Sequence, residues 1–126
     1  MLHCPQIAAA DDDLSNDNLS TARDMSRALL ALSADPTLAM TASAPSWTLA
    51  AQGRAPRLLH STNRLTGRSD LNVLAAKTGY TDTAGYCFTG LVEGEDGRRL
   101  LVTVLGAPSS GSRWADVERL LSWARG

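Results

Sequence analysis

Lysine is almost absent from this sequence: Lys77 is the only one, although lysine and arginine together number 12. Cysteine is also scarce. Cys4 and Cys87 alone do not make a disulfide scaffold, so the redox compartment stays open. No apolar run approaches the roughly 18 residues that a membrane-spanning helix needs. The start, MLHCPQIAAA, has no basic n-region and no true h-region, so we expect no signal peptide there. Leu2-His3-Cys4 lies too close to Met1 for a lipoprotein cleavage site.

The chain is short and nearly neutral. Its 126 residues make one domain or part of one, and a hydrophobic content of 44% allows a modest core. The formal net charge is −1 at pH 7. Nothing in this balance indicates nucleic acid or an acidic membrane surface as a partner.

Metal-ligand and triad patterns are also missing. Four potential ligands lack the spacing of a zinc site: His3, Cys4, His60 and Cys87. The acidic run from residue 11 begins like a calcium loop, but Asn16 stands at the required glycine and Ala22 at the required glutamate. The adjacency of His60 and Ser61 carries no weight, because triad members meet in space rather than in sequence. We therefore expect no metal and no cofactor.

The first half predicts one clear helix. Residues 1–18 read as a polar N-terminal arm. Thr21 and Asp24 fit a capping box, and the apolar residues that follow have helical spacing: Met25, Ala28, Leu29 and Leu32. Asp35-Pro36 should end this helix. Residues 37–56 are ambiguous, with Trp47–Leu49 and Arg57–Leu59 as two possible short strands. Trp47 is most simply a core or rim residue, with the lining of a cleft as the alternative.

The second half predicts a meander. Three strands are expected at Val73–Thr78, Gly85–Val92 and Arg99–Leu105, the last apolar enough to be buried on both faces. Residues 81–84 and 93–97 should be the connections. A final helix over 113–124 places five residues on one broad face: Trp114, Val117, Leu120, Leu121 and Ala124. The fold class is therefore α+β, with an antiparallel meander of three strands flanked by helices.

Lys77-Thr78-Gly79 is the sequence's one chemically suggestive tripeptide. It is not a nucleotide P-loop, because that motif needs glycine before the lysine and Ala76 stands there. An ammonium and a hydroxyl at the end of a strand can hold a carboxylate. A glycine beside them lets a substrate backbone approach closely.

Three segments in order carry a family resemblance: LSTARDMSRALLAL at 19–32, HSTNRL at 60–65 and KTGYTDTAGYCF at 77–88. Together they make the sequence resemble the low-molecular-weight D-alanyl-D-alanine carboxypeptidases, penicillin-binding serine peptidases that trim peptidoglycan stem peptides. The resemblance covers residues 18–124. It implies part of the serine β-lactamase/penicillin-binding fold and a location outside the cytoplasm, in the periplasm or cell envelope.

The resemblance also implies roles for individual residues. Lys77 would supply positive charge beside the nucleophile, and Thr78 would bind the terminal carboxylate of the substrate. Gly79 would allow close approach, and the Tyr80 backbone N–H would be one of two oxyanion donors. Asn63 matches a position near the site. The expected ligands are stem peptides ending in D-Ala-D-Ala and β-lactams.

Some family features are missing from this sequence. Leu74, Ala75 and Ala76 stand where the family usually has Asp-Gly shortly before the lysine, and His60 stands where it commonly has Asn. No Ser-x-x-Lys exists here, because Leu74 lies three residues before the only lysine, and no Ser-x-Asn precedes the first helix. We expect residues 19–126 to be the C-terminal part of such a catalytic domain.

Two functional interpretations follow. One is a D-Ala-D-Ala carboxypeptidase acting through an acyl-enzyme, to which this chain contributes the binding strand. The alternative is an inactive truncated remnant, or a binding module that keeps only the anion-binding strand. In either case the expected third strand, Arg99–Leu105, would present an apolar edge that pairs with another chain or with an N-terminal segment.

Overall fold

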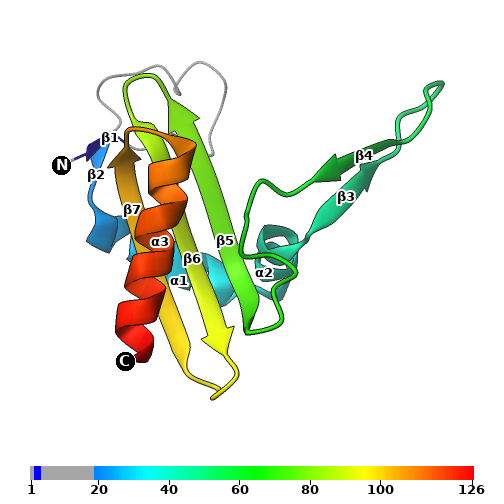
Figure 1. The fold of residues 1–126 in the computed structure, drawn as a ribbon. Coiled ribbons are helices and arrows are strands. Elements are labelled where there is room, and N and C mark those ends of the chain that lie inside the picture. Colours follow the sequence, from blue (N-terminus) through cyan, green and yellow to red (C-terminus); the bar gives the residue numbers. More distant parts are fainter. Residues whose placement is uncertain (1, 4–18) are drawn as a thin grey trace.

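A computed structural model describes residues 2–3 and 19–126. Its centre is a three-stranded antiparallel sheet in the order β5–β6–β7, formed by Leu71–Thr81, Gly85–Gly94 and Arg99–Ala107. Helix α3 (Ser110–Arg125) covers one face, and α1 (Ala22–Ser33) with α2 (Pro36–Ser43) covers the other (Figure 1). The prediction of an α+β chain with a flanked antiparallel meander is confirmed. None of the described helices is long and apolar enough to cross a membrane.

Both helices on the second face begin at caps that can be read in the sequence. The Thr21 hydroxyl oxygen accepts the Asp24 N–H at 3.1 Å, and its proton goes to the Asp24 carboxylate at 2.8 Å. Asp35 accepts the backbone N–H groups of Thr37 and Leu38, with Pro36 in the first turn. Asp35-Pro36 therefore ends α1 as predicted and also starts α2, a helix that the ambiguous reading of residues 37–56 missed.

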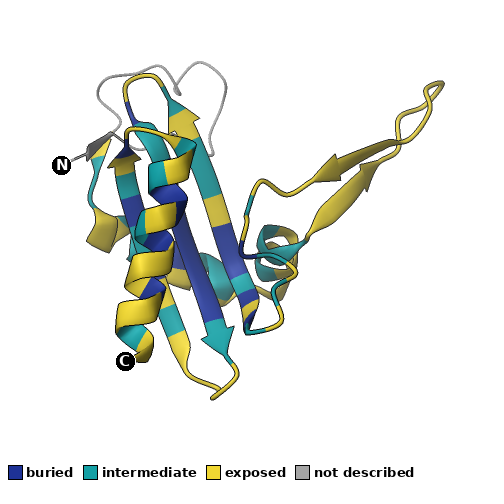
Figure 2. Cartoon of the chain, viewed as in Figure 1, coloured by how far each residue is buried: buried dark blue, intermediate teal, exposed yellow. Residues whose placement is uncertain are grey.

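A β-hairpin leaves the body of the molecule after α2. Strands β3 (Ser46–Leu49) and β4 (Arg57–His60) pair antiparallel, with Trp47 opposite Leu59. The two short strands that the sequence suggested are confirmed. Every residue of both strands is exposed, and the hairpin projects away from the three-stranded sheet (Figure 2).

The larger part of the core lies between the sheet and α3. Trp114, Val117 and Leu121 of α3 pack there with Phe88 of β6, whose ring centroid lies 5.0 Å from that of Trp114. Burying side chains of this size contributes about 1.5–3 kcal/mol each. A Cβ at Gly90 would come within 2.5 Å of the Phe88 ring, so the glycine makes room for it. Leu120, which was predicted on the buried face, is 40% exposed.

The opposite face of the sheet has a smaller core and a polar seam. Leu29 of α1 packs on Ala75 and Leu91. Beside them three hydroxyl groups, those of Ser26, Thr103 and Thr89, form a hydrogen-bonded chain. Thr103 lies 2.7 Å from Ser26 of α1 and 2.8 Å from Thr89, oxygen to oxygen. Because Thr89 is buried, these bonds satisfy groups that would otherwise be costly to remove from water.

A β-bulge in β5 changes which face its residues occupy. Val73 pairs with Val92 and Ala75 with Leu91, so Leu74 is an extra residue between them. Val73 packs towards α3, while Leu74 and Ala75 both pack on the α1 side. One inserted residue moves every later side chain to the other face. The bulge lies at the sequence departure noted above, where the family usually has Asp-Gly.

The burial predicted for strand β7 is wrong on one face. The part from Arg99 to Leu105 was expected to be buried on both faces of the sheet. Instead Val102 and Val104 are buried under α3, while Leu101, on the other face, is 37% exposed. That side is only partly covered because α1 spans less of β7 than α3 does. Among the described strands β7 pairs only with β6, so it lies at the edge of the sheet.

The prediction that residues 1–18 are a polar N-terminal arm is also partly corrected. Strand β1 (Leu2–His3) pairs antiparallel with β2 (Leu19–Ser20) near β7, so these two positions of the 1–18 arm are in a strand. The predictions for Met1 and for residues 4–18, Cys4 included, lie outside the described residues. The domain boundary at residue 18 stays a prediction.

The exposed edge of β7 predicts self-association of the 126-residue chain. We expect Leu101→Lys to shift the chain towards monomer, because a charge on an edge strand opposes pairing with another strand. Leu120→Lys is the matched control, since it removes a similarly exposed leucine from α3 rather than from the edge. Light scattering after size-exclusion chromatography measures the mass. A wild-type chain that stays monomeric at every concentration contradicts the prediction.

Candidate functional site

An apolar cleft of about 560 Å³ opens beside strand β5. One side is made by α1 and α2, another by the β3–β4 hairpin and the residues after it, and the floor by β5 and β6. The apolar lining residues come mostly from the helices and the hairpin: Met25, Ala28, Leu29, Leu32, Leu38, Ala42, Trp47 and Leu59.

Four of the five predicted site residues line this cleft. Lys77, Thr78 and Gly79 lie along β5, and Asn63 lies in the segment that leads into it. Lys77 is exposed, and its ammonium donates to the Thr78 carbonyl. Lys77 lies directly opposite Thr89, whose hydroxyl hydrogen-bonds to Thr103 on the face of the sheet that α1 covers. The bulge at Leu74 therefore places Lys77 on the α1 face. The role of these residues in binding stays a prediction.

Tyr80 is the fifth predicted residue, and its side chain is not part of the cleft lining. The phenol is 49% exposed and donates to an Asp82 carboxylate oxygen at 2.6 Å. That hydrogen bond raises the pKa of Tyr80. The ring stacks on Tyr86, with centroids 4.3 Å apart. The prediction concerned only the backbone N–H of Tyr80, which stays a prediction.

A hydroxyl pair joins the two segments that carry the predicted residues. Thr62 Oγ1 lies 2.6 Å from Thr78 Oγ1, and both residues line the cleft. Thr62 was not singled out in the sequence, although it lies within the matched segment next to Asn63. What the sequence does not show is the bond itself, because it joins two residues that lie sixteen positions apart.

Asn63 has a structural task as well as a place at the cleft. Its side-chain oxygen accepts the Leu65 N–H at 3.0 Å, and its own N–H donates to Ser61 Oγ at 3.2 Å. Leu65 is buried in the core under α3. One lone pair of the amide oxygen is used in this turn, so the Asn63 side chain keeps its NH₂ group and a second lone pair for a ligand.

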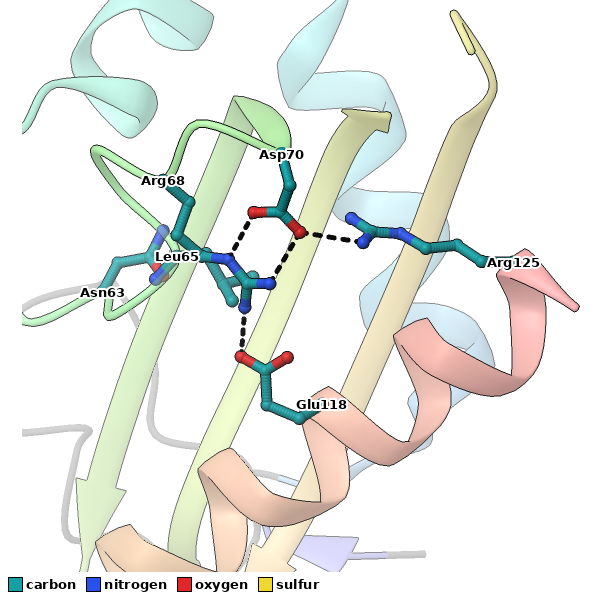
Figure 3. Close-up of polar contacts among 6 residues, drawn as sticks. All are labelled: Asn63, Leu65, Arg68, Asp70, Glu118 and Arg125. Atoms are coloured by element: carbon teal, nitrogen blue, oxygen red, sulfur yellow. Dashed lines mark hydrogen bonds and ion pairs between the residues drawn. The ribbon is translucent and has the colours of Figure 1, made fainter. Parts of the chain in front are cut away.

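An ionic cluster holds the same loop to α3 (Figure 3). Arg68 makes a bidentate pair with Asp70 at 2.8 and 2.7 Å, and also contacts Glu118 of α3. Arg125, at the end of α3, reaches the same Asp70 carboxylate at 2.8 Å. The two guanidinium groups, Arg68 first, hold the pKa of Asp70 well below its usual range. The loop that carries Thr62 and Asn63 is therefore fixed at its far end.

A buried arginine supports the strand beside β5. Arg113 donates to the Cys87 carbonyl at 3.2 Å, and its guanidinium lies 4.9 Å from the centre of the Trp114 ring. Burial lowers the pKa of Arg113. Cys87 is opposite Gly79, and burial raises the pKa of its thiol. No local sequence pattern indicates this arrangement, because the contact joins residues 26 positions apart along the chain.

Several cleft residues come from the region that the sequence left ambiguous. Leu38, Thr41 and Ala42 belong to α2, which was not predicted. Trp47, considered as a cleft residue, does line the cleft and is 51% exposed. Within residues 2–3 and 19–126, no group of three or more His, Cys, Asp and Glu side chains could hold a metal ion.

A model of the D-alanyl-D-alanine carboxypeptidase family matches residues 11–109, well over half of the chain. The chain belongs to this family. The match includes the cleft strand β5 and the loop that carries Asn63. The family resemblance stated from the three sequence segments is thereby confirmed.

Similar proteins from this family are much longer than this chain. A D-alanyl-D-alanine endopeptidase from Pseudomonas aeruginosa is 34% identical over 111 residues, which covers 87% of this chain and 36% of that protein. One from Escherichia coli is 29% identical over 119 residues, with the same shares. The chain therefore spans about a third of the length of these carboxypeptidase-family relatives.

A solved structure extends the family match to the fold. The crystal structure of a D-alanyl-D-alanine carboxypeptidase from Mycobacterium tuberculosis superposes with a TM-score of 0.70 at 26% identity. The match covers 83% of this chain and 40% of that one. The predicted fold class, part of the penicillin-binding carboxypeptidase fold, is consistent with this likeness.

The ionic cluster predicts acid-sensitive stability. Asp70→Asn should lower the melting temperature at pH 7, because the neutral amide cannot pair with two guanidinium groups. The folded-state pKa of Asp70 is depressed, so its stabilisation is present above the unfolded pKa of about 4 and is lost as pH falls. The wild-type advantage should therefore shrink between about pH 5 and pH 2. Calorimetry measures it.

The control for this experiment is Asp116→Asn. Asp116 pairs with Arg119 within α3, at an exposed position, and exposed pairs of this type contribute little. The Asp70 variant should lose several times more in melting temperature than the Asp116 variant. Equal losses, or a difference that does not change with pH, would show that the cluster does not hold the loop.

Proposed function

We propose that this chain forms the carboxylate-binding wall of a D-Ala-D-Ala peptidase site. The observation that carries the proposal is the convergence of Lys77, Thr78 and Asn63 at one apolar cleft beside an edge strand. The ligand class is a peptidoglycan stem peptide that ends in D-Ala-D-Ala. β-Lactams are expected to enter the same cleft.

The cleft chemistry suits such a peptide. Its lining is mostly apolar, which favours the alanyl methyl groups, and its polar groups include a cation and hydroxyls, which favour a carboxylate. Strand β5 pairs on one side only among the described strands, so its other edge can bind an extended peptide by main-chain hydrogen bonds. Gly79, without a side chain, allows that approach.

Hydrolysis needs groups beyond this wall. A serine peptidase of this class forms an acyl-enzyme, which requires a hydroxyl nucleophile with a base in reach. The sequence has no Ser-x-x-Lys, and its one lysine lies on the binding strand. In the whole peptidase, Lys77 would add positive charge beside the nucleophile, and the Tyr80 N–H would be an oxyanion donor. We place that peptidase outside the cytoplasm, with its peptidoglycan substrate.

Two alternatives remain within the same chemistry. The missing Ser-x-x-Lys favours a binding module or an inactive remnant. Such a protein keeps the anion cradle, the proposed carboxylate-binding residues Lys77, Thr78 and Gly79, but has no nucleophile for hydrolysis. The names of the two bacterial relatives favour an endopeptidase, which cleaves within a longer peptide rather than at its carboxyl end. An endopeptidase would not depend on a free carboxylate next to the cleaved bond, so ligand preference separates it from a carboxypeptidase.

Removal of the Lys77 charge tests the proposed wall. Lys77→Gln should weaken binding of N-acetyl-D-alanyl-D-alanine by roughly tenfold, because a charge-assisted contact is lost. NMR titration of the ¹⁵N-labelled chain measures the dissociation constant and places the ligand through shifts at residues 77–80. Arg57→Gln is the control, because it removes an exposed cation from β4 that does not line the cleft.

Two results would contradict the proposed wall. Failure of the wild-type chain to bind the dipeptide is one, and equal weakening by the Lys77 and Arg57 variants is the other. Equal weakening would mean that general positive charge, rather than the cradle, attracts the ligand.

The missing nucleophile predicts the response to penicillin. Incubation of the 126-residue chain with a fluorescent penicillin should give no labelled band after denaturing electrophoresis, because no activated serine is present to be acylated. Mass spectrometry checks the intact mass of the same sample. A covalent adduct of penicillin mass on any serine would refute the assignment of this chain to binding alone.

A further inference from the structure

We propose that Thr62 is a positioning residue that sets the preference of the cleft for a free carboxylate. The inference rests on the proposed function and extends it to a residue of the HSTNRL segment that the sequence analysis gave no role. Thr62 would act through Thr78, by donating its own proton to the Thr78 oxygen and so leaving the Thr78 proton for the ligand.

The two hydroxyls are held as a close pair. Their oxygens are 2.6 Å apart, within the usual range for an O–H···O bond, and both residues line the cleft. They come from different elements, Thr78 from β5 and Thr62 from the segment after β4. The pair therefore bridges the strand and the loop at the place where Lys77 and Asn63 also reach the cleft.

The loop fixes Thr62 from its C-terminal side. The Asn63 side chain closes a turn with the Leu65 N–H, and Leu65 is buried in the core. Farther along, Arg68 and Asp70 bind α3 through Glu118 and Arg125. These contacts hold the backbone next to Thr62. The backbone that carries the Thr62 side chain is thus held by contacts within the protein.

The number of protons on the Thr62 and Thr78 hydroxyls explains why the pair should prefer a carboxylate. Each hydroxyl has one proton to donate and can accept from others. If Thr62 donates to Thr78, the Thr78 proton is left to donate to a ligand. If Thr78 donates to Thr62, Thr78 can only accept. A carboxylate has no proton to donate at neutral pH, so it selects the first arrangement.

A terminal amide does not impose the same choice. Its carbonyl accepts and its NH₂ donates, so it can meet the Thr78 hydroxyl in either arrangement. The pair should therefore strengthen binding of a peptide acid more than binding of the corresponding amide. Without Thr62, the Thr78 hydroxyl would turn freely and lose the donor that polarises it.

The experiment compares N-acetyl-D-alanyl-D-alanine with its C-terminal amide. NMR titration of the full 126-residue chain gives both dissociation constants for the wild type and for Thr62→Val, which keeps the side-chain shape. The acid should bind roughly threefold to tenfold more weakly to the valine variant, while amide binding changes little. Thr62→Ser should restore the acid preference, because it returns the hydroxyl.

A second threonine in the same loop gives the matched control. Thr66 follows Thr62 in the segment between β4 and β5 and is not among the residues that line the cleft. Thr66→Val should leave the ratio of the two dissociation constants unchanged. Thr62→Ala serves as a second loss variant if the valine disturbs the loop, which the amide spectrum of each unliganded variant reveals.

The outcomes separate this inference from the proposed function. If the wild type binds neither peptide at residues 77–80, the proposed function fails and the inference fails with it. If the wild type prefers the acid and the Thr62 loss variants keep the same ratio, only the inference is overturned, and Lys77 alone accounts for the preference. Loss of the preference with rescue by Thr62→Ser supports the role of Thr62.

Discussion

The bulge at Leu74 is the local constraint on which the geometry of the cleft depends. Side chains in a strand alternate between faces, so an unbulged β5 would send Lys77 towards α3 and its core. The extra residue places Lys77 on the α1 side, in line with Thr89, and places Thr78 on the face of Phe88. Lys77 and Thr78 thus lie on opposite faces of β5, and both line the cleft beside the edge of this strand that does not pair with β6.

Two different kinds of interaction hold the walls of the cleft. Strand β5 is fixed by a ladder with β6 and by apolar burial, neither of which depends on the attraction between charged groups. The loop with Thr62 and Asn63 is fixed by one buried leucine and by the charges around Asp70. Acid or high salt should therefore loosen the loop before the strand. The distance between the two threonines is the part of the site most exposed to such changes.

Local signals predicted much of this fold, and contacts distant in sequence limited the rest. The Thr21 cap, the three strands of the meander and the final helix follow from spacing and capping, which are properties of neighbouring residues. The start of α2 was readable from Asp35-Pro36 but was treated only as a stop. The burial of β7 was overestimated because an apolar run does not reveal how far the packing helix extends. The pairing of Thr62 with Thr78 and the cluster around Asp70 join separate elements and have no signature in local sequence.

The positions of the cradle residues explain why binding can be studied apart from hydrolysis in this chain. One strand carries three consecutive residues of the site, Lys77, Thr78 and Gly79, and one loop carries the other two, Thr62 and Asn63. The site is therefore formed once this strand and this loop are placed correctly relative to each other. Each of those elements is fixed by contacts made within residues 19–126. A serine nucleophile would have to reach the cleft from elsewhere, and its arrival would not need to rearrange the strand. The proposed anion-binding residues and an attacking group are therefore separable in physical terms, and an affinity measured with this chain reports on binding alone.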